Sequence, residues 1–361
     1  MIALISFILI ISAWLASIFV SNTIALSLLL LWISVVVVLK TTPFFIKRMN
    51  AQKWSMYKDI NKIGAPKVAG LGSFPIMFGF TAAVMLSIFA FSFVHFIKLD
   101  LTLLFAGFTT VFLIGCIGLF DDIIGWKKGI RQYQHALLPL AAALPLMAVR
   151  IGETTMSLPF IGLVDFGIIY SLILIPIGIT GAANATNMLA GLNGLEAGLG
   201  SILAATMLVL GFWTGNMEVI VLMSALLGAL IAFIYFNWFP AKIFPGDAVT
   251  LMVGASIAVA AIIGNLEKFG IALLALFFIE LYLKARTRFQ AESFGVPQKN
   301  GTLKAPERIG SFTHLMMRSG KLTEKQVVKR ILVLQAIVSL LVLLWFYLNS
   351  IKVFVGVVPW L

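Results

Sequence analysis

Long apolar stretches alternate with short polar breaks along almost the whole chain. A membrane-spanning helix needs about 20 consecutive, mostly apolar residues, and eleven stretches approach this requirement. They cover residues 2–20, 24–46, 71–97, 101–120, 133–150, 165–187, 192–213, 217–239, 247–265, 267–285 and 328–348. The pattern therefore predicts an all-α integral membrane protein, a polytopic bundle of ten or eleven transmembrane helices in one domain over residues 1–361.

The composition places these stretches in a membrane. Hydrophobic residues make up 61% of the 361 residues and charged residues only 11%, which is too little polar surface to cover a soluble globule of this length. No small-residue cleavage site follows the first stretch, so we expect an additional N-terminal helix at about 2–20 and not a removed signal peptide. Cys116 is the single cysteine of the chain, and it can form neither an internal disulfide nor a zinc cluster.

The basic residues predict an orientation, because cytoplasmic loops carry the excess of Lys and Arg. If the helices alternate in direction, 22 of the 26 basic residues fall on one side, and Lys98, Arg150, Lys268 and Lys352 fall on the other. This places the amino terminus and every long loop in the cytoplasm and the carboxyl terminus outside. The net charge of +12 thus follows topology, with a phosphate-rich substrate as a second contribution, and does not indicate a nucleic-acid partner.

The stretch NATNMLAGLNGLEAG, residues 184–198, interrupts the apolar pattern with asparagines, glycines and a glutamate. Asn184 and Asn187 lie three residues apart and would share one face of a helix. The glycines permit a break between two helices and close approach of a ligand. We therefore predict a ligand site at this break, next to the membrane surface.

Two further polar clusters fall on the same predicted side. Asp121 and Asp122 end the helix at 101–120 in GLFDDIIGW, and Asp247 follows the helix at 217–239 in NWFPAKIFPGD. A charge buried in the membrane costs about 3 kcal/mol on insertion scales, so acids at these positions are functional candidates. All three clusters are predicted to meet at the cytoplasmic interface.

These acids favour magnesium as the cofactor, with Mn²⁺ as a substitute. Asp121 and Asp122 repel one another unless a cation or a cationic complex lies nearby. The chain has only three histidines, and oxygen ligands fit Mg²⁺ far better than Zn²⁺. Mg²⁺ commonly bridges carboxylates to substrate phosphates.

The motifs FDD, NATNMLAGLNGLEAG and FPGD, in this order, resemble those of the polyprenyl-phosphate N-acetylhexosamine-1-phosphate transferases. The resemblance is greater to the eukaryotic and archaeal branch that transfers GlcNAc-1-phosphate from UDP-GlcNAc to dolichyl phosphate. It extends from about Lys58 to His314, with support from DINK at 59–62 and YFNWFP at 235–240. It implies a catalytic core at about 40–350 and a cytoplasmic loop at about 286–327.

The resemblance implies direct phosphoryl transfer. A phosphate oxygen of the lipid would attack the β-phosphate of UDP-GlcNAc and give GlcNAc-diphospho-lipid and UMP, the first step of lipid-linked glycan assembly for N-glycosylation or a cell-surface polysaccharide. The resemblance also implies that the protein lies in the plasma membrane of a prokaryote, an archaeon, and that it forms a homodimer. The residues themselves do not choose between dolichyl and undecaprenyl phosphate, or between GlcNAc and another N-acetylhexosamine.

Carried over residue by residue, the resemblance implies roles for the three motifs. Asp247 and Asn187 would hold Mg²⁺ on the nucleotide diphosphate, and Asp121 and Asp122 would lie beside the lipid phosphate. The remaining substrate-binding candidates are Gly191 and Asn193 for uridine, Glu196, and Asp59, Asn61 and Lys62 of the DINK motif. Phosphoryl transfer depends on alignment and charge neutralisation, and we expect Asp121 to position the phosphate more than to act as an indispensable base.

The chain departs from the family pattern in two places. A lysine usually stands where this chain has His135 in QHALLP, and Lys127, Lys128 or Arg131 are the residues that could compensate for it. The segment from Arg286 to Lys325 lacks both the paired histidines of bacterial members and the HRxPR-like motif of eukaryotic ones. In this segment, the diphosphate or sugar contacts would come from Arg286, Arg288, Lys304 and Arg308.

Other interpretations stay open at this point. Asp247 could serve only as the start of a helix, the glycines could serve only helix packing, and Asn184 could pair helices within the membrane. A transporter of nucleotide sugars or lipid-linked sugars is the alternative function, although transporters place polar groups near the bilayer midplane and commonly contain a repeat, which we do not find. The DG-AR-type motif of CDP-alcohol phosphotransferases is also not found.

Overall fold

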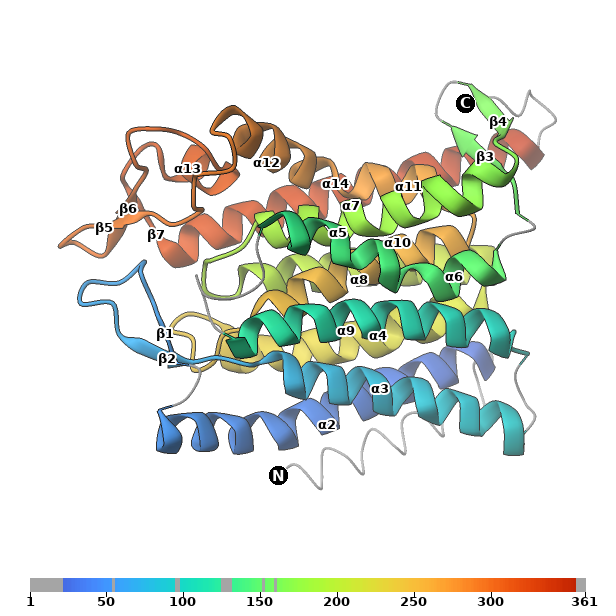
Figure 1. The fold of residues 1–361 in the computed structure, drawn as a ribbon, viewed down its shortest axis with the longest axis horizontal. Coiled ribbons are helices and arrows are strands. Elements are labelled where there is room, and N and C mark those ends of the chain that lie inside the picture. Colours follow the sequence, from blue (N-terminus) through green and yellow to red (C-terminus); the bar gives the residue numbers. More distant parts are fainter. Residues whose placement is uncertain are drawn as a thin grey trace.

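The computed structural model describes residues 22–53, 56–94, 98–124, 132–150, 153–158 and 161–354. Within these ranges the chain forms a bundle of helices that run nearly side by side, with small β-sheets at its two ends (Figure 1). The prediction of an all-α polytopic membrane protein is confirmed. The predicted helix at 2–20 lies outside the described residues.

The described helices and strands are given in chain order, and η marks a π-helical turn. They are α2 (Asn22–Gln52), β1 (Met56–Lys58), β2 (Lys67–Ala69), α3 (Ser73–Phe89), η1 (Ala90–Val94), α4 (Leu101–Ile124), α5 (Gln132–Ala142), α6 (Leu144–Val149), β3 (Thr155–Leu158), β4 (Gly162–Asp165), η2 (Tyr170–Leu174), α7 (Ile175–Met188), α8 (Leu195–Thr214), α9 (Met217–Asn237), α10 (Asp247–Ile263), α11 (Glu267–Leu273), α12 (Ala275–Arg286), β5 (Val296–Pro297), β6 (Thr302–Lys304), α13 (Phe312–Met317), β7 (Leu322–Thr323) and α14 (Glu324–Phe354).

The other ten predicted stretches are helical. Six helices are long and apolar enough to cross a membrane within the described ranges: α2, α3 with η1, α4, α8, α9 and α14. The remaining four stretches form shorter or interrupted helices, namely α5 with α6, η2 with α7, α10, and α11 with α12. In these four places apolar length alone overestimated the length or the continuity of the helix.

Two of the interruptions coincide with particular side chains. Pro145 is the second residue of α6, and proline lacks the N–H that would continue the hydrogen bonds of α5. The second break, at Leu274, separates α11 from α12, and the side chain of Gln335 in α14 donates to the carbonyl of Leu273 there at 3.0 Å. A side chain from a neighbouring helix thus satisfies a backbone group near the break.

The short strands were not predicted. β1 pairs antiparallel with β2, with Met56 opposite Ala69, and β3 pairs with β4. β6 lies between β5 and β7 in the third sheet. The β1–β2 and β5–β6–β7 sheets lie at one end of the bundle and the β3–β4 hairpin lies at the other (Figure 1).

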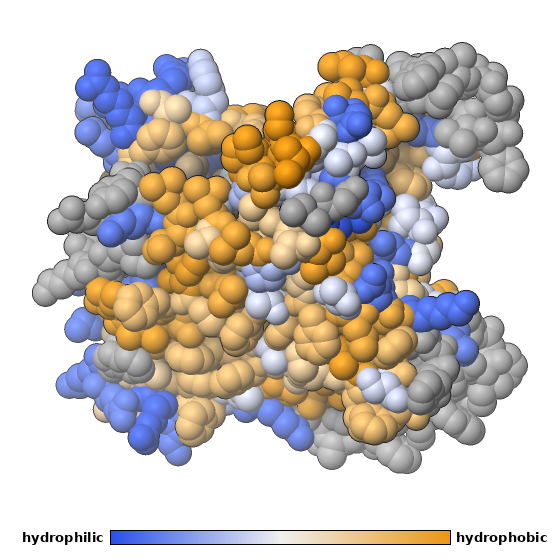
Figure 2. All heavy atoms as spheres, turned by 45° about the vertical axis from the view of Figure 1, so that its right-hand side comes forward, coloured by the Kyte–Doolittle hydropathy of each residue, from blue (hydrophilic) through white to orange (hydrophobic). Residues whose placement is uncertain are grey.

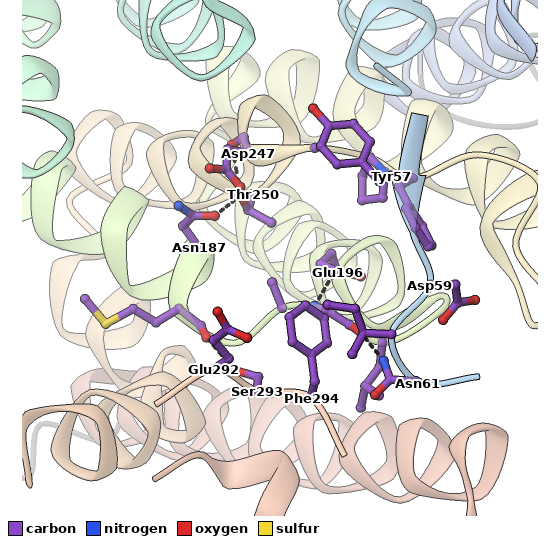
Figure 3. A pocket seen from close by; sticks show the side chains of 18 of the residues that line it. Tyr57, Asp59, Asn61, Asn187, Glu196, Asp247, Thr250, Glu292, Ser293 and Phe294 are labelled. Carbon is purple, nitrogen blue, oxygen red and sulfur yellow. Dashed lines mark hydrogen bonds between the residues drawn. The ribbon is translucent and has the colours of Figure 1, made fainter. Parts of the chain in front are cut away.

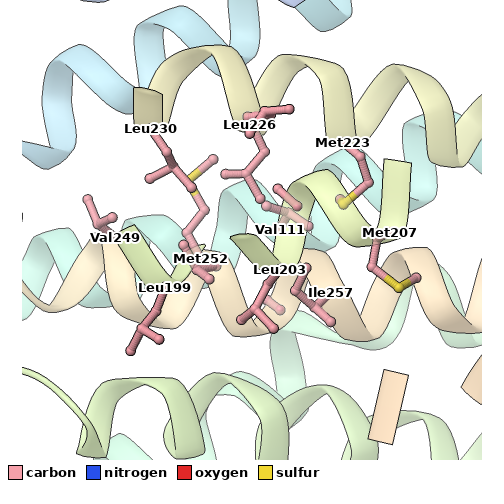
Figure 4. Packing of buried hydrophobic residues seen from close by; sticks show 14 of the residues in the cluster. Val111, Leu199, Leu203, Met207, Met223, Leu226, Leu230, Val249, Met252 and Ile257 are labelled. Carbon is pink, nitrogen blue, oxygen red and sulfur yellow. The ribbon is translucent and has the colours of Figure 1, made fainter. Parts of the chain in front are cut away.

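The core is built around α9 and α10. In its most apolar window, 83% of the residues of α9 are buried inside the protein, against 22% for α14, so α9 is central and α14 is peripheral. α9 packs on α2 and α8, and α10 packs on α4 and α7. Leucine, methionine and β-branched side chains of α4, α8, α9 and α10 interdigitate there (Figure 4).

The outer surface matches a membrane protein. Figure 2 shows a broad hydrophobic area between hydrophilic groups toward the ends of the molecule. Large apolar side chains such as Leu340 and Leu341 of α14 are 65% and 60% exposed. Such a surface is stable when lipid covers it.

Candidate active site

A cavity of about 390 Å³ lies at the end of the bundle that carries the β1–β2 sheet. Its lining brings together eight of the residues that the sequence predicted: Asp59, Asn61, Asp121, Asp122, Asn187, Gly191, Glu196 and Asp247. Tyr57, Phe244, Thr250 and Lys284 also line it, as do Glu292, Ser293 and Phe294. In Figure 3, Asp247 and Asn187 lie on one side, Asp59 and Asn61 on another, and Glu292 to Phe294 below them.

A backbone ladder joins the end of β2 to the FPGD segment. Phe244 N donates to the carbonyl of Ala69 at 2.8 Å, and Gly72 N donates to the carbonyl of Phe244 at 2.9 Å. Because β1 pairs with β2, the residues that follow β1 reach the cavity beside Asp247.

Asp122 organises the start of α10. Its Oδ1 accepts the N–H of Asp247 at 2.9 Å and its Oδ2 accepts the N–H of Ala248 at 3.2 Å. A Cβ on Gly118 would lie 2.5 Å from Ala248 Cα, and one on Gly246, whose φ is +79°, would lie 2.3 Å from Asp122 Oδ2. The two glycines thus permit the approach of α4 to α10, and both Asp122 oxygens bind the positive end of that helix.

Asn187 and Asp247 are held by the first turn of α10. Thr250 Oγ1 lies 2.7 Å from Asn187 Oδ1, to which it donates, and 2.9 Å from the carbonyl of Asp247. Thr186 Oγ1 donates to the carbonyl of Thr250 at 2.7 Å, which ties α7 to α10. These contacts place the Asn187 amide and the Asp247 carboxylate on one wall of the cavity, with Asp121 of α4 nearby.

The glycine-rich loop between α7 and α8 forms another wall. Gly191 N donates to Glu196 Oε1 at 2.5 Å, and the carbonyl of Gly191 accepts from Asn61 Nδ2 at 2.7 Å. Asn61 Oδ1 in turn accepts from Gly295 N at 3.0 Å. Asn61 therefore links the loop after β1 to both the glycine-rich loop and the segment after α12.

Asn193 and Lys62 do not line the cavity. Asn193 is 1% exposed, and its side chain donates to Asp59 Oδ2 at 3.2 Å and accepts from Ala241 N at 2.8 Å. Lys62 Nζ lies 2.6 Å from Asp59 Oδ2 and 4.8 Å from the centre of the Phe239 ring. Both residues lie behind the cavity wall that Asp59 helps to form.

The four basic candidates of the segment after α12 also lie outside the lining. Arg286, Arg288, Lys304 and Arg308 are exposed. Arg286 lies over the Tyr282 ring at 5.8 Å, and Arg308 donates to the carbonyl of Arg286 at 3.2 Å. The side chains of His135, Lys127, Lys128 and Arg131 lie outside the described part of the chain.

Sequence reasoning missed the wall that this segment does form. Lys284 is 8% exposed, and its Nζ donates to the carbonyl of Ala291 at 2.6 Å and to Ser293 Oγ at 3.0 Å. Glu280 Oε1 lies 3.5 Å from the same Nζ. Lys284, a lysine at the end of an apolar helix, was the only sequence signal for this wall. Nothing in the AESF run at 291–294 marks it as a site.

His314 supports the same wall from α13. Its Nε2 lies 3.1 Å from the carbonyl of Phe294, and its Nδ1 accepts the N–H of Gly310 at 3.3 Å. The two contacts select the neutral ring with the proton on Nε2. Burial lowers the pKa of His314 below its usual value, and the nearby Lys284 ammonium lowers it further.

The lining carries an excess of negative charge. Its described residues include the carboxylates of Asp59, Asp121, Asp122, Glu196, Asp247 and Glu292, against the ammonium groups of Lys58 and Lys284. Within the described ranges no three His, Cys, Asp or Glu side chains are grouped closely enough to hold a metal ion by themselves. Mg²⁺ needs only one or two carboxylates when substrate phosphates and water complete its shell, so the donor set of Asp247 and Asn187 fits it.

Comparison with known proteins identifies similar chains. The model of glycosyl transferase family 4 matches residues 103–265. A protein of Saccharolobus solfataricus, provisionally named UDP-N-acetylglucosamine–dolichyl-phosphate N-acetylglucosaminephosphotransferase, is 36% identical over 80% of this chain and 87% of its own length. The protein with that name in Dictyostelium discoideum is 27% identical, over 78% and 79% of the two chains. A phospho-N-acetylmuramoyl-pentapeptide-transferase of Halalkalibacterium halodurans is 30% identical, over 70% and 79%.

Proposed function

Because the chain belongs to glycosyl transferase family 4, we propose that it transfers GlcNAc-1-phosphate from UDP-GlcNAc to a dolichyl or related polyprenyl phosphate and releases UMP. The names of its relatives in Saccharolobus and Dictyostelium support this donor and acceptor. The observation that carries the proposal is the convergence of Asp121, Asn187 and Asp247 on one cavity at one end of the bundle. The product would enter lipid-linked glycan assembly.

The reaction proposed is a single displacement. A phosphate oxygen of the lipid forms a bond to the β-phosphorus of UDP-GlcNAc, and the bond from that phosphorus to the bridging oxygen breaks, so that UMP leaves with the electron pair. A lipid phosphate has a second pKa near 6 and is largely dianionic at neutral pH. A strong base is therefore not required, and alignment and charge neutralisation are what the protein must supply.

The charge of the cavity supports a role for magnesium. Six carboxylates in the lining would repel a diphosphate. Bound Mg²⁺, or Mn²⁺ in its place, would neutralise the diphosphate and polarise the bond to the leaving group. Asp247 and Asn187 are the residues proposed to hold the metal, and Thr250 orients Asn187 for it.

The geometry supports different roles for the two neighbouring aspartates. Asp122 binds two backbone N–H groups of α10 and so positions Asp247. Asp121 lines the cavity next to it and is the residue proposed to orient the lipid phosphate. Asn61 and Asp59 lie across the cavity from Asp247 and Asn187 (Figure 3), and Asn61 donates to the carbonyl of Gly191. We place the nucleoside on this wall.

A transporter is the alternative, and the position of the polar groups argues against it. Transporters bind substrate near the middle of the membrane between repeats. Here the acidic residues gather at one end of the helices, between short sheets and loops. Membership of a glycosyl transferase family also favours the transferase.

The deciding experiment uses purified protein in detergent with Mg²⁺, dolichyl phosphate and UDP-GlcNAc labelled in the sugar. We expect label in the organic phase and an equal amount of UMP, with activity lost in EDTA and restored by Mg²⁺ or Mn²⁺. Release of UDP instead would contradict phosphoryl transfer. If no UDP-N-acetylhexosamine and no polyprenyl phosphate gives product, transport into proteoliposomes becomes the function to test.

Orientation and oligomeric state are separate parts of the proposal. The charge distribution predicts that the cavity faces the cytoplasm, and the family resemblance implies an archaeal cell and a homodimer. Labelling of a cysteine introduced at exposed Lys299 in a Cys116→Ser background, in intact cells and in opened ones, tests the orientation. The mass of the detergent-solubilised protein tests the dimer.

A further inference from the structure

A buried contact joins the start of the last helix to the glycine-rich loop of the cavity. Glu324 is the first residue of α14 and is 2% exposed. Its Oε1 accepts the backbone N–H of Asn193 at 2.7 Å and the side-chain Nδ2 of the same residue at 2.5 Å. One carboxylate oxygen therefore holds both the backbone and the side chain of a residue 131 positions away.

The contact completes a series of anchors along the loop. Ala190, Gly191 and Leu192 line the cavity, and the loop pairs with none of the strands in the described ranges. Its backbone N–H groups are instead bound by side chains: that of Gly191 by Glu196, that of Asn193 by Glu324, and that of Gly194 by Asn237 at 3.1 Å. Glu324 is the anchor that comes from the C-terminal part of the chain.

The same contact also reaches Asp59. Asn193 Nδ2 lies between Glu324 Oε1 and Asp59 Oδ2, so one amide bridges two carboxylates. Lys62 pairs with Asp59. The other oxygen of Glu324, Oε2, is buried and has no hydrogen-bond partner among the described residues. A buried carboxylate with one unsatisfied oxygen is a costly arrangement that a leucine at the same site would avoid, and a packing role alone does not account for it.

We propose that Glu324 is a positioning residue for the nucleotide-sugar wall of the cavity. By fixing Asn193 it fixes the carbonyl and amide positions of Gly191 and Leu192, and through the Asn193 amide it fixes Asp59 on the facing loop. Glu324 also follows β7 directly, so it links the β5–β6–β7 sheet to the glycine-rich loop. The assignment of this wall to the donor substrate rests on the proposed function.

The test compares Glu324→Leu with Glu324→Gln, because glutamine keeps an oxygen that can accept both Asn193 donors and leucine does not. Glu307→Leu, an exposed acid of the same segment, is the matched control. We expect Glu324→Leu to raise the KM for UDP-GlcNAc at least tenfold, with the KM for the lipid changed less than threefold. The KM of Glu324→Gln for UDP-GlcNAc should stay within about threefold of the parent's value. The KM of Glu307→Leu should equal the parent's value.

Hydrogen exchange provides a readout that does not depend on activity. Amides of the 189–195 segment should exchange at least tenfold faster in Glu324→Leu than in the parent, while those in the middle of α9 stay protected. An unchanged exchange rate in this segment would overturn the proposal, even if the enzyme proves to use another substrate. Equal increases of both KM values, or a glutamine variant as impaired as the leucine variant, would also overturn it.

An inactive parent protein would instead contradict the proposed function. The exchange measurement would still decide the role of Glu324 in that case. The two failures are therefore distinguishable.

Discussion

At the end of the bundle that carries the cavity, six carboxylates face two ammonium groups around a space of about 390 Å³. At the opposite end, Arg150 is 7% exposed and donates to the carbonyl of Ile262 at 3.1 Å and to Asn265 Oδ1 at 2.7 Å. Glu153 lies 3.2 Å from the same guanidinium. Tyr170 donates to Glu267, which is 8% exposed.

The difference lies in how charge is compensated. At the Arg150 end, the guanidinium pairs with Glu153 and donates to two oxygens within the protein, which stabilises a closed junction of α6, α10 and α11. At the cavity end, like charges accumulate around an opening, which costs free energy unless something positive binds there. An excess of one sign of charge around a cavity indicates a binding site, whereas a pair of opposite charges indicates a structural joint.

Removal of the proposed metal ligand should have the largest effect. We expect Asp247→Ala to lower kcat by about 10³-fold, comparable to the loss of a major electrostatic contact to the transferred group. Turnover measured against Mg²⁺ concentration checks this, with Glu307→Ala as a surface control. Full turnover of Asp247→Ala at ordinary Mg²⁺ would remove Asp247 from the metal site.

Loss of the Asp122 charge should have the next largest effect. Asp122→Asn replaces one accepting oxygen by an NH₂ group that faces the N–H of Asp247 or Ala248. We expect turnover to fall by about 10²-fold, because a small misplacement of Asp247 is enough for that, while the protein stays folded. Asp121→Asn leaves α10 in place, so the KM for the lipid should rise in that variant and not in Asp122→Asn.

At the Arg150 end, a substitution should lower stability and leave turnover nearly unchanged. Arg150→Met removes two hydrogen bonds from a charged donor, and the free energy of unfolding should fall by about 3 kcal/mol. Turnover per folded molecule should stay within twofold of the parent. Thermal unfolding together with activity of the surviving fraction measures both, and a selective loss of activity would mean that the two ends are coupled.

The smallest effect concerns pH. His314 binds fewer protons folded than unfolded, because burial lowers its pKa. Stability is then retained above about pH 6.5, the ordinary pKa of histidine, and declines as the pH falls below it, by at most about 1.4 kcal/mol per pH unit. The midpoint of thermal unfolding between pH 7.5 and 5.5 tests this, because the contribution of His314 is the part of the parent's slope that is missing in His314→Leu.

The sequence alone determined the class of protein and the grouping of its motifs. Apolar length located the ten described helical stretches, because a segment of about 20 apolar residues has few alternatives to a helix in a membrane. The alternation of helix direction then placed Asp121, Asn187 and Asp247 at one end, and the cavity contains all three. The resemblance carried by these motifs agrees with the family that the comparisons identify.

Only the tertiary structure decided which polar atoms face the cavity. Asn193 and Lys62 face away from it, the arginines at 286, 288 and 308 remain on the surface, and Lys284 with Glu292 to Phe294 forms a wall that no motif announced. Each of these placements depends on hydrogen bonds between side chains and backbone groups of segments that are distant along the chain, such as Asn193 with Glu324 and Asp122 with Asp247. Apolar length and charge are local properties that a sequence displays, whereas such contacts exist only after the helices have packed.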